Sequence, residues 1–341
     1  MKRSLPILLL STVLLAIPTL AQDLPTPEEY FGFEMGTDRK LARWDKMVDY
    51  YYLLGEASPR MNVVNMGEST LGNPFLVLYI SSPENLNNLD ELKQINARIA
   101  DPRGYRPEQI DAAVDAGKVV MVQSMGLHSS EVAGSQMAVD LTYDMLTRED
   151  EEMMRILDNT ISIFIPCFNP DGEIMVTDWY NETVGTEYEG LGLPFLYHHY
   201  IGHDNNRDAY MQNTVGSQYG GEIMFREWIP QAYIDHHQMG AFGPRLYLPP
   251  YAEPIRPDGD PLVWREMAVR CAYGLQRGGS RPLGRGERRH LLRLGALRVS
   301  LDYPVPQHRR HAHRIRQCAV SYTAVSASRP VAGRTPGVSG L

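Results

Sequence analysis

The feature that most constrains the fold is an alternation of short apolar runs with longer segments of helical spacing. The apolar runs lie at residues 61–66, 74–80, 118–124, 160–168 and 232–235. The segments with helical periodicity lie at residues 39–54, 82–100, 132–146 and 220–228. Strands that alternate with helices form a sheet with helices packed on both of its faces. We therefore expect an α/β fold with a mixed, mostly parallel central sheet.

The first residues predict a secretory signal peptide at residues 1–21. Lys2 and Arg3 make a basic start, an apolar stretch runs to Leu20, and small residues precede the expected cleavage site. A membrane anchor is the alternative, but the apolar run is short and Pro18 interrupts its end. We therefore expect an exported protein, periplasmic or secreted, with no membrane contact after cleavage.

Charge and composition both reverse near residue 276. The whole chain has a net charge of -8, which argues against a nucleic-acid partner, yet residues 277–341 hold 13 Arg, no Lys and only two acidic residues. Three explanations compete for this segment: a basic tail that binds nucleic acid or an acidic surface, a disordered extension, or the out-of-frame translation of a GC-rich gene. We favour the last, because the helical pattern before residue 276 stops abruptly. The main folded domain would then span residues 22–276 and lack its last core elements.

One His and one Glu lie three residues apart directly after the apolar run at 118–124. They belong to the sequence GLHSSEVAG and are His128 and Glu131. Zinc prefers imidazole and carboxylate ligands, and a junction between a strand and a helix can aim both side chains at one point. Alone the pattern is weak, since such a pair is more often a surface pair or a helix start.

Three further polar clusters follow apolar runs along the chain. They are FNPDG at 168–172, HDNNRD at 203–208 and IDHHQM at 234–239. The first is a turn signal, and the second is an ordinary solvated loop unless its Arg grips a carboxylate. Neighbours on a strand point to opposite faces, so only one of His236 and His237 can face a metal ion.

Taken in this order, H-x-x-E, N-P-D-G, D-x-N-R and a His at a strand end resemble the zinc carboxypeptidase family, the carboxypeptidase A-like metallopeptidases. The resemblance covers residues 25–275. It implies one zinc ion held by His128, Glu131 and His237. In the family, an Asp and an apolar residue precede the last ligand, which places His236 in the apolar position.

The resemblance also implies roles for the HDNNRD cluster. Asn206 and Arg207 match the pair that holds the terminal carboxylate of the substrate, and Asp204 matches an acid that orients a zinc-bound His. Two alternatives stay open at this point: Asp204 is an ordinary turn residue, or Asn205 takes the place of Asn206.

The implied activity is the hydrolysis of C-terminal residues from peptides or proteins by a monomeric enzyme. In the family, zinc activates water and the scissile carbonyl, a Glu transfers the proton, and an Arg stabilises the oxyanion. Two further readings are a non-catalytic, zinc-bearing module that binds peptide C-termini, and a zinc amidohydrolase that acts on acylated amino acids.

This sequence departs from the family at two catalytic positions. No Arg occurs between Arg155 and Arg207, where the oxyanion Arg belongs. The general-base Glu belongs on a late strand, which falls within residues 277–341, and the only Glu there is Glu287, with no strand pattern around it. We assign no general base, so the sequence predicts zinc binding more firmly than turnover.

Overall fold

The computed structural model describes residues 24–238, 246–247 and 319–324. The signal peptide predicted at 1–21 and the residue Glu287 lie outside these ranges. The helices are α1 Pro27–Phe31, α2 Trp44–Ala57, α3 Pro83–Asn87, α4 Leu89–Ala100, α5 Pro107–Ala116, α6 Ala133–Thr147, α7 Glu151–Asn159, α8 Pro170–Thr183, η1 Asn205–Asp208, α9 Val215–Glu222 and η2 Ile223–Glu227. The strands are β1 Met61–Glu68, β2 Pro74–Ile80, β3 Val119–Ser124, β4 Thr160–Ile165, β5 Ala232–His237, β6 Leu246–Tyr247 and β7 Ala319–Ala324. Within these ranges no helix combines the length and apolar character needed to span a membrane.

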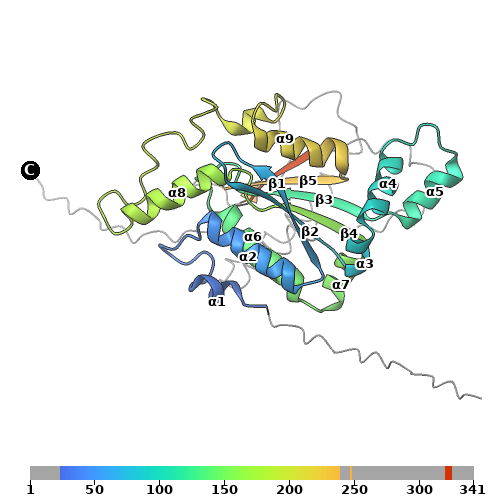
Figure 1. Cartoon of the computed structure of the whole chain (residues 1–341), viewed down its shortest axis with the longest axis horizontal. Coiled ribbons are helices and arrows are strands. Elements are labelled where there is room, and N and C mark those ends of the chain that lie inside the picture. Colours follow the sequence, from blue (N-terminus) through green and yellow to red (C-terminus); the bar gives the residue numbers. More distant parts are fainter. Residues whose placement is uncertain (1–23, 239–245, 248–318, 325–341) are drawn as a thin grey trace, which may run out of the picture.

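The strands form one mixed sheet with the order β1-β2-β4-β3-β5-β7-β6. At its centre, β3 pairs in parallel with β4 and with β5, and β5 pairs in parallel with β7. The pairs β1–β2, β2–β4 and β6–β7 are antiparallel. Figure 1 shows α2 and α6 on one side of the sheet and α9 on the other. The predicted fold class, a mixed sheet with helices on both faces, is confirmed.

Buried side chains on both faces of β2 explain why its sequence is apolar throughout. Leu76 and Leu78 belong to a core cluster that includes buried residues of α2 and α6. Their neighbours Phe75 and Val77 belong to a second cluster on the opposite face, together with Trp228. A continuous apolar run, in place of strict alternation, is typical of a strand that is covered on both faces.

The N-P-D-G sequence begins a long helix and is more than a turn. Asn169 caps α8, because its side-chain oxygen accepts a hydrogen bond from the Gly172 backbone N–H at 3.0 Å. Pro170 occupies the first turn, where a missing N–H costs nothing. The strand before it, β4, ends at Ile165, three residues earlier than the apolar run predicted.

Part of the Arg-rich segment takes a place in the sheet. Residues Ala319–Ala324 form β7, which pairs in parallel with β5 at the edge that a missing last strand would leave open. The composition of the segment predicts no strand there, because flanking Arg residues dominate it. Val320, Tyr322 and Thr323 are nevertheless good strand formers. The rest of 277–341 lies outside the described residues.

Candidate metal and peptide C-terminus site

The loop between β3 and α6 carries His128 and Glu131 on a single turn. Gly126 opens this loop with a backbone φ of 63°, a left-handed conformation that glycine adopts without strain. The Glu131 backbone N–H then donates to the His128 carbonyl oxygen at 2.9 Å, which folds the two side chains toward the same side. The H-x-x-E spacing therefore brings both groups together within one turn of backbone.

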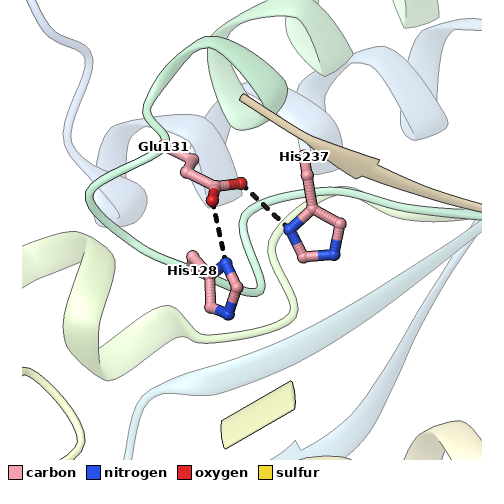
Figure 2. A group of neighbouring side chains, drawn as sticks. All are labelled: His128, Glu131 and His237. Carbon is pink, nitrogen blue, oxygen red and sulfur yellow. Dashed lines mark hydrogen bonds and ion pairs between the residues drawn. The ribbon is translucent and has the colours of Figure 1, made fainter. Parts of the chain in front are cut away.

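His237, the last residue of β5, completes a cluster with these two side chains (Figure 2). The Nδ1 atom of His128 lies 2.8 Å from Oε1 of Glu131, and Nδ1 of His237 lies 3.0 Å from Oε2 of the same carboxylate. One ligand atom from each residue lies within 4.8 Å of the others. Because β3 and β5 are parallel neighbours, their carboxyl ends meet at one edge, and the cluster forms there.

Two further carboxylates contact the outer nitrogens of the imidazoles. Nε2 of His128 lies 3.0 Å from Oδ1 of Asp204, and Nε2 of His237 lies 2.6 Å from Oδ2 of Asp235. Each histidine thus presents Nδ1 to Glu131 and Nε2 to an aspartate. A carboxylate behind a ring fixes the tautomer and the orientation that a metal ligand needs.

These contacts shift the pKa values of all three side chains in the cluster. Burial alone would raise the pKa of Glu131, but hydrogen bonds from His128, His237 and the Gln238 backbone hold it at about 2. Burial alone would lower the pKa of His237, but its bonds to Asp235 and Glu131 raise it to about 10. The hydrogen bond to Glu131 also raises the pKa of His128.

The donor set fits a divalent zinc ion. Two imidazole nitrogens and one carboxylate are a common protein ligand set for catalytic zinc, which leaves a fourth position for water or substrate. Both ligand nitrogens face the same carboxylate, and the outer nitrogens are already bonded to aspartates. A metal ion would replace the protons shared between the imidazoles and Glu131, so His128, Glu131 and His237 could hold it.

The neighbouring His236 points to the opposite side of β5. Its Nε2 atom lies 2.9 Å from Oε1 of Gln123, and its side chain is buried. Burial lowers the pKa of His236 to about 4, which keeps the ring neutral. The alternation along the strand therefore separates the two histidines as predicted, and the structure brings His237 to the cluster.

The HDNNRD segment lies beside the cluster and distinguishes its two asparagines. Nδ2 of Asn206 is 3.3 Å from Nε2 of His237, whereas Asn205 turns away and donates to the Leu127 carbonyl oxygen at 2.6 Å. Nε of Arg207 lies 3.8 Å from Oδ2 of Asp204, and its side chain is 70% exposed. Asp204 is thus more than a turn residue, since it also contacts His128.

Two residues beside the cluster, Gln238 and Asp235, are not predicted from the sequence as parts of the site. The Gln238 backbone N–H donates to Oε2 of Glu131 at 2.7 Å, and the Gln238 side chain accepts from the Ala133 N–H at 3.0 Å. The other neighbour is Asp235, which the sequence presents only as part of the IDHHQM cluster. Its position two residues before His237, on the same strand face, was the available signal.

The chain is similar to known proteins in sequence and in fold. The family model described as zinc carboxypeptidase matches residues 47–235, more than half of the chain. No curated protein matches the chain. The carboxypeptidase A of Helicoverpa armigera is similar over 87% of this chain and 68% of its own, at 16% identity and a TM-score of 0.47.

Two other solved structures are similar at lower coverage. A metallo-carboxypeptidase from Burkholderia cenocepacia has 12% identity and a TM-score of 0.48, over 82% of this chain and 60% of its own. Thrombin activatable fibrinolysis inhibitor has 11% identity and a TM-score of 0.46, over 76% of this chain. The chain thus spans 60% of the length of either of these structures. The match to the family model is the finding that decides: this chain belongs to the zinc carboxypeptidase family.

Proposed function

We propose that this chain is a zinc metallocarboxypeptidase-like protein that acts on the C-termini of peptides. The observation that carries the proposal is the convergence of His128, Glu131 and His237, whose ligand atoms lie within 4.8 Å of one another. Membership of the zinc carboxypeptidase family supports zinc as the metal. The proposed zinc ion, when bound, supplies a Lewis acid for the scissile carbonyl and lowers the pKa of a water ligand.

Asn206 and Arg207 are the proposed anchor for the terminal carboxylate of the peptide. The guanidinium of Arg207 is largely exposed, and among the described residues its one ion pair is a 3.8 Å contact with Asp204, so it can turn toward a ligand. A planar guanidinium can bind a carboxylate through two parallel hydrogen bonds. Such an anchor beside the metal cluster would place the last peptide bond near the metal.

In the part of the chain that the structure describes, no residue is a candidate for the general base of the reaction. There, the acids that contact the two histidines are Glu131, Asp204 and Asp235, and each already serves as a proposed ligand or as the partner of a ligand. The exposed guanidinium of Arg207 beside the cluster also supports a second candidate function, a zinc-bearing module that binds peptide C-termini without cleaving them. Both functions use the same metal and carboxylate sites.

We also propose that the protein is exported to the periplasm or the outside of the cell. The basic start and apolar run of residues 1–21 support this location. We propose that it acts as a monomer, with peptide or protein C-termini as its partners and without nucleic acid.

A pair of peptides tests the function. The zinc-loaded chain is incubated with one peptide that has a free C-terminal carboxylate and with the same peptide amidated at its C-terminus. Mass spectrometry then follows the loss of one residue, and isothermal titration calorimetry measures the binding of both peptides. Cleavage of the free form alone supports the peptidase, and binding without cleavage supports the module. Equal cleavage or equal binding of the two forms would exclude both.

A further inference from the structure

A row of hydrogen-bonded groups runs along one face of β5 behind His237. Tyr233, Asp235 and His237 alternate along the strand, so their side chains lie on the same face. Ser124, at the end of β3, is the register partner of Asp235 and reaches the same row. The Ser124 hydroxyl lies 2.7 Å from Oδ1 of Asp235 and 2.7 Å from the Tyr233 hydroxyl.

The chemistry of these groups fixes the direction of every bond in the row. An ionised Asp235 can only accept, so the Ser124 hydroxyl must donate its single hydrogen to it. Ser124 has no second hydrogen, and the hydroxyl of Tyr233 therefore donates to Ser124. The other carboxylate oxygen of Asp235 accepts from Nε2–H of His237 at 2.6 Å. With one proton on Nε2, which the Nδ2 group of Asn206 at 3.3 Å can then only approach without a hydrogen bond, Nδ1 on the side of Glu131 is the nitrogen left to a metal ion that displaces the proton shared there.

The two proposed histidine ligands are supported in different ways. Asp235 lies within the sheet and its side chain is only 8% exposed, whereas Asp204 lies in a loop and is 41% exposed. A strand position next to β3 restricts the movement of Asp235 more than a loop restricts Asp204. The orientation of His237 is therefore set by the sheet itself.

We propose that Tyr233, Ser124 and Asp235 form a positioning relay that holds His237 in the tautomer and orientation needed to bind the metal ion. These residues act through His237 and are not ligands themselves. The inference rests on the proposed zinc site and extends it by three residues, one of which comes from β3. Its consequence is that metal affinity depends on a hydroxyl group two hydrogen bonds away from the ligand.

Zinc affinity, measured by competition with a chromogenic chelator, tests the relay on the full chain. Removal of a carboxylate behind a metal-bound histidine weakens metal binding by roughly 10- to 100-fold, and we expect this loss for Asp235→Asn. Ser124→Ala and Tyr233→Phe should each weaken zinc by roughly 3- to 10-fold, the effect of one hydrogen bond. Tyr219→Phe is the matched control, because its hydroxyl bonds to the Glu68 carbonyl oxygen on β1; it should bind zinc normally.

The double variant gives a readout that general destabilisation would not move. Tyr233 acts only through Ser124, so Ser124→Ala/Tyr233→Phe should bind zinc about as weakly as Ser124→Ala alone. Circular dichroism of each variant checks that it folds, and the absorption bands of the Co²⁺-loaded chain report the ligand geometry. Asp235→Asn with wild-type affinity, or fully additive losses in the double variant, would overturn the relay. Zinc binding that depends on His237 but not on Asp235 would leave the proposed function standing and the relay refuted; a wild type without zinc would refute both.

Discussion

One buried carboxylic acid, Glu173 on α8, contributes to the dependence of stability on pH. Its side chain is buried, where it accepts hydrogen bonds from the Trp44 backbone N–H at 2.8 Å and from the Thr177 hydroxyl at 2.9 Å. Burial raises the pKa of Glu173 to about 8. The acid is therefore protonated in the folded chain at neutral pH, whereas it is ionised in the unfolded chain.

Glu173→Gln should make stability fall less steeply as the pH rises. Because the folded pKa is raised, the contribution of this group to stability is complete below about pH 4.5 and is lost as the pH rises toward 8. The slope for one such group is about 1.4 kcal/mol per pH unit. Urea unfolding at several pH values in this window would measure it. Glu182→Gln, an exposed change on the same helix, should keep the wild-type slope; an unchanged slope in Glu173→Gln would contradict this account.

Arg207 is the residue whose change should separate peptide binding from metal binding. We expect Arg207→Ala to weaken the binding of a peptide with a free C-terminus by roughly 10- to 100-fold, the effect of losing a charge-assisted hydrogen bond. Arg207→Lys should recover only part of this, because an ammonium group lacks the planar fork. Calorimetry with zinc-loaded protein measures the affinity. A lower zinc content in Arg207→Ala would show instead that the change disturbs Asp204.

At the scale of elements, the loop between β3 and α6 sets the position of His128 and Glu131. Gly126 in this loop and Gly72 in the β1–β2 turn both have positive φ values, 63° and 88°. An alanine at either place costs about 1 kcal/mol of folding free energy from backbone strain. Gly126→Ala should also weaken zinc binding, whereas Gly72→Ala should not. Thermal unfolding and chelator competition on both variants decide this, and equal zinc affinities would refute the role given to the loop.

The helices and strands differ in how strongly the sequence predicts them. The central strands and the helix after His128 could be predicted, because their apolar runs and helical spacing are strong. Helices α5 and α7 are not predicted by strong periodicity; their starts are marked only by Pro107 in the first turn and by Asp150 as the N-cap. Strand alternation allows only one of His236 and His237 to face the cluster, and the family resemblance selects His237. The contact of Asp235 with Ser124 depends on the pairing of β5 with β3, which no local pattern encodes.

At the scale of the whole molecule, the sheet depends on residues far apart in the chain. β7 covers the edge of β5, the strand that carries Asp235 and His237, and Tyr322 is the register partner of His236. Tyr322→Pro would remove a backbone donor within this strand. We expect a lower melting temperature and weaker zinc binding, measured by calorimetry and chelator competition. Val331→Pro, seven residues past β7, is the control; unchanged behaviour of Tyr322→Pro would show that β7 does not support the site.

The zinc content of the purified chain tests the central claim most directly. Inductively coupled plasma mass spectrometry should find about one zinc ion per wild-type chain, as a single site of three protein ligands requires. His237→Ala and His128→Ala should each lose the metal. His236→Ala changes the adjacent residue on the opposite face of β5 and should keep it. A wild type without zinc, or loss of zinc in His236→Ala but not in His237→Ala, would contradict this account.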